Sequence, residues 1–422
     1  MSGGGGGEGR TWVYILAGGV ALCGVGYTLE RTEAGPHWLA IGALAIGGLA
    51  VVFGSCESMI KCVEGVGQRM GWNQFVAGTL AGLASNIPEI VMLGFVVAAA
   101  PRVAFVVVAL TLHVNSLIFG IYSGLLPRDA TGVARLPVAL VKISTDLYAA
   151  GGGVFLATGC LMVLMTVFDS GESRGEGFGV VDLYTIGACL LMVQVVSTTQ
   201  MIKRFSKLGT SAEPAPVTMG ASAEAAAKTA TETTGAVDAG EEATGAVEPE
   251  EKEEAPSWLA IAGYGVLGTL TSLLGGHAVG DFADALVESL NEAGYPEMIG
   301  AIILSLFAGA GSYVMIATAH VKKKYDIALA NVSGAITQVP FVVLPAVMIL
   351  IAALAQLGVI GHLPGGAVLR IDLETTSVIL LAFPPMLIMW KSIQDDGILN
   401  WVETAGMLAV FGLTLYFLAL HG

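Results

Sequence analysis

Charged residues are scarce in this sequence. They make up 13% of its 422 residues, about half of the roughly 25% that is usual in soluble domains. Basic residues are scarcer than acidic ones, with 19 Lys and Arg against 34 Asp and Glu, for a net charge of -15. Such low charge excludes an ordinary soluble surface. Much of the negative charge sits in one segment, so the net charge says little about partners, and we expect no nucleic-acid partner.

Cysteine motifs and catalytic motifs are also missing. The five cysteines are scattered and form no CxxC pair, which argues against a disulfide framework or a zinc site. No glycine-rich loop ending in Lys-Ser/Thr follows a strand pattern, so ATP-driven pumping is not indicated. Nothing resembles a nucleophile and base in a soluble context. We therefore expect neither an enzyme nor a bound cofactor.

Long hydrophobic runs are what the sequence does have. Hydrophobic residues make up 55% of the chain, and the mean hydropathy is +0.76. The runs approach 20 residues, the length that crosses about 30 Å of hydrocarbon. They predict an all-α polytopic membrane protein with about eleven spans, near 12–29, 38–60, 74–99, 103–125, 145–168, 179–202, 258–280, 297–320, 326–357, 374–391 and 398–420.

Two further patterns support these spans. The first run is too long for a signal-peptide core and lacks a small-residue cleavage site, so we interpret it as a retained helix. All six tryptophans fall at predicted span ends, where their rings suit the membrane interface. They are Trp12, Trp38, Trp72, Trp258, Trp390 and Trp401.

Lysine and arginine in the short loops predict the orientation, because basic residues favour the cytoplasmic side. Alternate loops are poor in them, as in ERTEAGPH at 30–37 and DSGESRGEGFG at 169–179. This predicts a multi-pass cell-membrane protein with a cytoplasmic N-terminus and an external C-terminus. The basic loops carry Lys61 and Arg69; Arg128, Arg135 and Lys142; Lys203, Arg204 and Lys207; and Lys322, Lys323 and Lys324.

Residues 206–256 interrupt the pattern. They are rich in Ala, Thr, Glu and Gly, and such a segment buries too little apolar surface to offset its ordering entropy. We expect a disordered, acidic, cytoplasmic linker whose partner the sequence does not identify; a regulatory cation-binding loop is the alternative. The expected order is a flexible N-terminus (1–11), an extra helix and loop (12–36), a first transmembrane half (37–205), the linker (206–256) and a second half (257–422).

The two halves resemble each other. WLAIGALAIGGLAVVFGS from Trp38 matches WLAIAGYGVLGTLTSLLGG from Trp258, and IPEIVM, ending at Met92, matches AGSYVM, ending at Met315. An odd number of crossings separates matched helices, so the two repeats are predicted to have opposite orientations in the membrane. Many transporters contain such inverted repeats. In such folds the binding site lies near the midplane, where the repeats meet.

The matched segments are similar to the sodium/calcium exchanger superfamily. Its first repeat has a helix reading roughly G-x-x-x-x-A-x-G-T-S-x-P-E, represented here from Gly78 to Ala84-Ser85-Asn86-Ile87-Pro88-Glu89. DIALANVSG, from Asp326 to Gly334, resembles the second-repeat motif D-I-A-x-G-N-x-x-G. The resemblance covers nearly the whole chain except the first helix and the linker. It implies five-helix inverted halves plus one extra N-terminal helix.

The second repeat is degenerate. The counterpart of Pro88-Glu89 is Gly311-Ser312, so the family's second acid is missing. The positions expected to hold Ser-Asn after Asn331 hold Ala335 and Ile336, with Thr337 and Gln338 beside them; the corresponding first-repeat triplet is His113-Val114-Asn115. By resemblance, oxygen atoms from both repeats surround the cation, and this chain keeps one acid.

Glu89 is the first candidate site residue, because it lies midway along its span, where an ionised carboxylate is costly and usually functional. Pro88 lacks an N–H and is expected to break the helix, offering carbonyls beside the Ser85 and Asn86 side chains. Hard cations such as calcium or sodium prefer such oxygen ligands. The alternative is a protonated Glu89 hydrogen-bonded to a neighbouring helix, with no transport role.

The candidate partners of Glu89 are neutral oxygen donors, which also serve as ordinary packing contacts between membrane helices. Asn115 is preferred to His113, whose more common role is a packing hydrogen bond. At the outer end of one span, His277, Asp281, Asp284 and Glu288 form either an acidic vestibule or a solvated helix end. The remaining candidates, all from the second repeat, are Ser312, Asn331, Thr337 and Gln338.

The sequence thus predicts a secondary cation antiporter with alternating access around Glu89. By resemblance the ions are calcium exchanged for sodium or protons. With one carboxylate, calcium keeps a net positive charge in a low-dielectric site, which is costly, so a monovalent cation/proton exchanger is the first alternative. A non-transporting membrane scaffold or sensor with the same fold is the alternative from another class.

Overall fold

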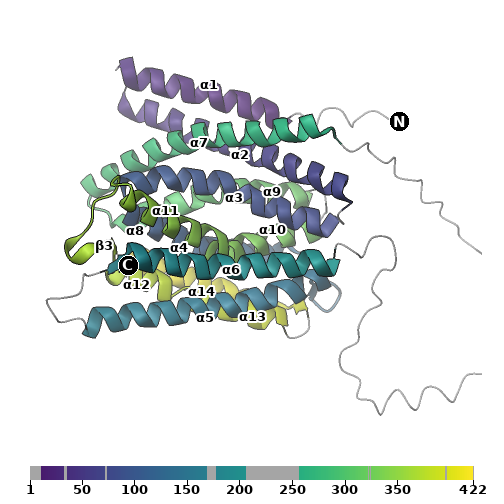
Figure 1. The fold of residues 1–422 in the computed structure, drawn as a ribbon. Helices are drawn as coiled ribbons and strands as arrows, with labels where there is room; N and C mark the ends of the chain where they lie inside the picture. Colours follow the sequence, from purple (N-terminus) through teal and green to yellow (C-terminus); the bar gives the residue numbers. More distant parts are fainter. Residues whose placement is uncertain are drawn as a thin grey trace, which may run out of the picture.

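The computed structural model describes residues 11–32, 36–71, 74–168, 177–205, 256–321, 323, 325–394 and 397–421. Within them the chain forms a bundle of long helices whose axes are roughly parallel or antiparallel (Figure 1). The predicted flexible N-terminus up to residue 10 and the predicted linker from 206 to 255 lie outside the described residues.

The first half contains an extra helix and five more, as the hydrophobic runs predicted. Each is long and apolar enough to cross a membrane, and each ends where charged, proline or glycine residues interrupt its run. These helices are α1 (Thr11–Thr32), α2 (His37–Met70), α3 (Gln74–Ala99), α4 (Pro101–Leu125), α5 (Val138–Phe168) and α6 (Val180–Phe205).

The second half is less regular. The predicted span 297–320 divides at Gly309, the span 326–357 contains a π-helical segment, and the span 374–391 divides at residues 381–382. The proline at 340 removes one backbone donor, and π segments accommodate such irregularities. The elements are α7 (Trp258–Glu292), α8 (Glu297–Ala308), α9 (Ala310–Val321), α10 (Tyr325–Gln338), η2 (Val339–Val343), α11 (Leu344–Gln356), α12 (Leu373–Leu380), α13 (Phe383–Gln394) and α14 (Trp401–His421).

Contacts between the halves follow the predicted repeat. The first helices of the two halves, α2 and α7, pack on each other, and so do α5 and α13. The contact of α3 with α7 has its counterpart in α9 with α2, and that of α6 with α11 in α14 with α4. These contacts thus occur in pairs that are related by exchanging the two halves, which is the arrangement expected of an inverted repeat.

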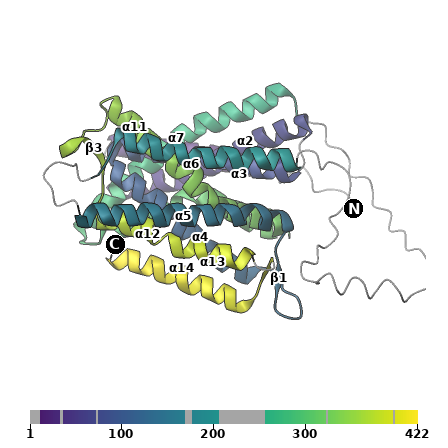
Figure 2. The same cartoon turned by 60° about the horizontal axis from the view of Figure 1, so that its bottom comes forward.

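Two short antiparallel ribbons, which the sequence analysis did not predict, repeat this exchange in the loops. β1 (Ala134–Arg135), before α5, pairs with β4 (Ile398–Leu399), before α14. β2 (Gly177–Gly179), before α6, pairs with β3 (Ala367–Arg370), before α12. β1 and β3 lie at opposite ends of the bundle (Figure 2). Each ribbon therefore joins loops predicted to share one side of the membrane; which side is cytoplasmic stays a prediction.

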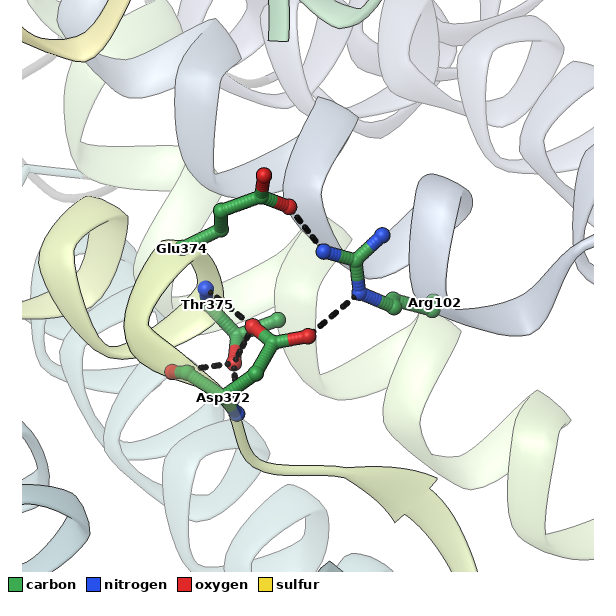
Figure 3. A network of polar contacts seen from close by, with 4 residues as sticks. All are labelled: Arg102, Asp372, Glu374 and Thr375. Carbon is green, nitrogen blue, oxygen red and sulfur yellow. Dashed lines mark hydrogen bonds and ion pairs between the residues drawn. The ribbon is translucent and has the colours of Figure 1, made fainter. Parts of the chain in front are cut away.

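The core runs along α4, whose residues from Ala104 to Ser116 are all buried. Both ends of α4 are fixed to the second half by arginines. At its start, the Arg102 guanidinium donates to Asp372 over 2.7 Å and also pairs with Glu374, across from the N-terminus of α12 (Figure 3). Just beyond its end, Arg128 bonds the carbonyl of Leu399 and the hydroxyl of Thr404. The central helix is thus held to elements of the other repeat.

Candidate cation site between the two halves

Glu89 lies inside α3, as predicted, with its side chain turned into the bundle. The residue is 9% exposed. Among the described residues its Oε1 atom has no hydrogen-bond partner. A buried carboxyl oxygen without a partner carries a large desolvation cost unless it is protonated or binds a cation. This atom is the chemical feature around which the site is built.

The expected helix break at Pro88 is wrong: α3 runs without interruption from Gln74 to Ala99, with Pro88 inside it. Proline still removes one backbone donor. Transmembrane helices tolerate this loss where neighbouring helices and side chains satisfy the backbone, and α3 packs against α2, α4, α7 and α10. The Ser85 side chain lies outside what the structure describes.

Asn86 connects Glu89's helix to the second half. Its Nδ2 donates to Gln338 Oε1 over 2.7 Å, and both side chains are buried. Gly82, one turn earlier, leaves room for the same group: a Cβ added there would lie 3.6 Å from Gln338 Nε2 and 3.9 Å from Asn331 Oδ1. The structure therefore brings Asn86, Gln338 and Asn331 together on one side of α3.

Asn115 of α4 makes a second connection between the first half and the second. Its Oδ1 accepts a hydrogen bond of 2.8 Å from the Tyr313 hydroxyl of α9, and its Nδ2 donates to Ala335 O over 3.2 Å. The repeat matches the α3–α10 pair of helices with the α9–α4 pair. The Asn86–Gln338 and Tyr313–Asn115 bonds therefore join corresponding pairs of helices. Each links one half to the other through an amide.

Two predicted ligands are placed differently. The Thr337 hydroxyl donates back to Ser333 O and Gly334 O of its own helix, at 3.2 Å each. Ser312 is partly exposed in α9, three residues beyond the break at Gly309. His113 has the packing role that was preferred for it over a role in transport: its Nε2 lies 2.9 Å from Val378 O, and the residue is 1% exposed.

Sequence reasoning missed several polar contacts. Tyr313 follows Ser312 inside an apolar run. A tyrosine buried there needs a hydrogen-bond partner for its hydroxyl, and this need is the signal that could have identified Tyr313. Ser333 bonds Ser144 at 2.8 Å and Tyr148 at 2.7 Å, tying α10 to α5. No spacing rule predicts such pairs, because their members are remote in sequence.

The acidic residues near the end of α7 divide into two groups. Asp284, Glu288 and Glu292 line a cavity of about 400 Å³ together with Val96 and Ala100 at the end of α3. Val96 lies two turns beyond Glu89 on the same side of α3, since seven residues make about two helical turns. The cavity thus lies at one end of the bundle, further along the face that carries Glu89.

His277 and Asp281 contact each other instead, with Nδ1 and Oδ1 3.6 Å apart. The His277 ring stacks on Phe95 and lies against Tyr27 of α1, at centroid distances of 5.3 and 5.7 Å. His277 therefore packs α7 against both α1 and α3, and neither His277 nor Asp281 is among the residues that line the cavity of Asp284 and Glu288.

Comparisons with known proteins agree with this architecture. Residues 261–420 match the sequence model of the family described as Sodium/calcium exchanger protein. The solved structure of the H+/Ca2+ exchanger CAX is similar, with a TM-score of 0.56 and 11% identity over 97% of this chain and 92% of that one. Native YfkE gives 0.54 and 15%, over 97% and 99%. A search of curated protein sequences finds no match.

The fold defines an all-α polytopic membrane protein of the exchanger architecture. The family match covers the second half of the chain, and the similar structures share its fold across both halves.

Proposed function

We propose that the protein is a secondary cation antiporter in which the exchanged ions compete for Glu89. The observation that carries this proposal is that Oε1 of the buried Glu89 carboxyl has no hydrogen-bond partner in the part of the chain that the structure describes. Intramembrane acids are expensive and mark ion or proton pathways. The chain's exchanger fold supports the same conclusion.

The neighbouring amides supply the remaining ligands in this proposal. Asn86 donates through Nδ2, which leaves its Oδ1 to face a cation, and Asn331 Oδ1 lies on the same side of α3. Because calcium and sodium are bound by carboxylate and amide oxygens, a cation that sheds water here exchanges it for these atoms. Ser312, Thr337 and Gln338 are proposed as outer members of the site, reached when the halves rearrange.

The superfamily and the H+/Ca2+ exchanger among the similar structures suggest calcium, exchanged for protons or sodium. One observation favours a second candidate, a monovalent cation/proton exchanger. Ser312 stands where the repeat places the counterpart of Glu89, so this pair of positions holds one carboxylate where two would neutralise a divalent ion. An unneutralised charge in a low-dielectric site is costly.

Flux into proteoliposomes tests both candidates. Calcium-45 uptake driven by an outward sodium or proton gradient supports the first, and proton movement with sodium or potassium alone supports the second. We expect Glu89→Gln to abolish the flux and Glu89→Asp to retain part of it.

Asp146→Asn is the matched control, because Asp146 is an exposed acid in another helix, α5. Unchanged flux in Glu89→Gln contradicts the proposal. A folded wild-type protein that moves no cation in any gradient favours a membrane scaffold or sensor.

A further inference from the structure

Tyr313 fills the break in the helix that corresponds to α3. The break lies at Gly309, between α8 and α9. A Cβ at position 309 would overlap the Tyr313 ring and hydroxyl, so the phenol crosses directly over the glycine. Tyr313 immediately follows Ser312, the counterpart of Glu89. A bulky neutral side chain therefore lies beside the position of the missing acid.

The phenol also holds Asn115. The Asn115 amide is 3% exposed and engaged at both ends: its oxygen accepts from the Tyr313 hydroxyl at 2.8 Å, and its nitrogen donates to Ala335 O at 3.2 Å. The oxygen is the atom that a cation would bind. In this structure the hydroxyl takes a lone pair of that atom and fixes its direction.

Asn115 lies near the amides beside Glu89. It bonds the carbonyl of Ala335, which is one turn of α10 before Gln338, and Gln338 in turn bonds Asn86 of Glu89's own helix. A proton on Glu89 completes a covalent O–H bond and requires no further ligand. A metal cation requires several oxygens. Withholding one amide oxygen thus weakens cation binding and leaves proton binding nearly unaffected.

We infer that Tyr313 is a positioning residue that withholds the Asn115 oxygen from the site at Glu89, and so sets how strongly cations compete with protons there. This inference rests on the proposed antiport at Glu89. It adds a residue that determines specificity without itself binding the ion.

The experiment uses the full chain in proteoliposomes and the cation that the wild type transports best. Tyr313→Phe keeps the ring and removes the hydroxyl. We expect the half-saturating cation concentration to fall about three- to tenfold, the scale of one neutral hydrogen bond. The pH at which protons half-inhibit uptake should move to lower values. Maximal flux is not expected to rise, which separates affinity from turnover.

Two further variants make the test specific. Tyr313→Phe combined with Asn115→Ala should lose the gain, because the released oxygen is gone. Tyr148→Phe is the matched control: it removes a buried hydroxyl whose bond to Ser333 is 2.7 Å long, in a different helix. Should Tyr313→Phe fold poorly in a melting assay, Tyr313→Leu also lacks the hydroxyl and is expected to shift affinity in the same direction.

An unchanged or weaker cation affinity in Tyr313→Phe, with flux that still depends on Glu89, overturns the inference and leaves the antiport intact. An equal gain in Tyr148→Phe overturns it as well, because the effect is then not local to the site. Loss of the proposed function gives a different result, a wild-type flux that is absent or insensitive to Glu89→Gln, and it removes the inference too.

Discussion

Asn86 and Gln338, 252 residues apart in sequence, are joined by a hydrogen bond of 2.7 Å between their buried side chains. The bond links α3 of the first half to α10 of the second, three residues from Glu89. It therefore holds the two repeats together at the level of the candidate site.

Breaking this bond is expected to destabilise the protein. Asn86→Leu and Gln338→Leu should each lower the melting temperature in detergent, and the double variant should cost less than the sum. Coupling energies between membrane helices average about 0.6 kcal/mol and reach about 1.7 kcal/mol. Gln194→Ala is the control, because Gln194 bonds Thr198 within α6. Strictly additive effects would mean that the two amides do not interact.

Asp372 should make stability depend on acid pH. Burial raises the pKa of its carboxyl, but hydrogen bonds from Thr375 and Arg102 outweigh burial and hold the pKa below its usual value. A depressed folded pKa contributes stability that is present above the unfolded pKa, and that stability is lost as the pH falls through the folded value. We expect melting temperatures of the wild type to drop below about pH 4.

Two variants separate charge from helix capping at this position, because Asp372 caps α12 by accepting from the Thr375 N–H at 2.9 Å. Asp372→Asn keeps a good cap and should flatten the acid dependence. Asp372→Ala loses the cap as well and should cost about 1 kcal/mol more. If Asp372→Asn retains the wild-type dependence below pH 4, another carboxylate is responsible.

Gly309 is expected to be intolerant of a side chain. Gly309→Ala places a methyl group where the Tyr313 ring lies, and overpacking of this kind costs about 1–3 kcal/mol. Adding Tyr313→Ala should recover part of that loss in a detergent melting assay. Gly412→Ala is the control, because nothing lies within 4 Å of its added Cβ. If neither Gly309→Ala nor Gly412→Ala changed the melting temperature, the close contact between Gly309 and the Tyr313 ring would be contradicted.

Arg128 should not be replaceable by lysine. Its two terminal nitrogens donate to Gly132 O, Leu399 O, Ser123 O and Thr404 Oγ1 at 2.8–3.0 Å. Its guanidinium also lies 3.9 Å above the Trp401 ring centroid. Lysine is a point charge without this planar fork.

We expect Arg128→Lys to destabilise the protein by about 2 kcal/mol or more, since several hydrogen bonds to a charged group are lost together. The measurement is again thermal unfolding, with proteolysis near residues 129–133 as a local readout. Arg135→Lys, in the exposed β1 position, is the control and should be neutral. Similar losses at both positions would indicate a general effect of charge and not the bonds of Arg128.

Much of the fold was predictable because each span leaves a continuous apolar run. The irregular helices were not, since Pro88 leaves α3 intact while α8 and α9 divide at a glycine. Proline's missing donor is a local property, but whether a helix breaks depends on the neighbours that satisfy the backbone. Glu89, as a lone acid inside an apolar run, was predictable for the same reason as the spans.

The sequence by itself determined the architecture: a continuous apolar run of about 20 residues satisfies its backbone in hydrocarbon as a helix, so these runs predicted where the chain crosses. It also predicted that one acid, Glu89, remains where the two repeats are expected to meet. Only the tertiary structure decided which atoms surround that acid. The Asn86–Gln338 and Tyr313–Asn115 bonds join residues about 200 or more positions apart, and hydrogen bonds depend on distance and direction in space, which no spacing along the chain encodes.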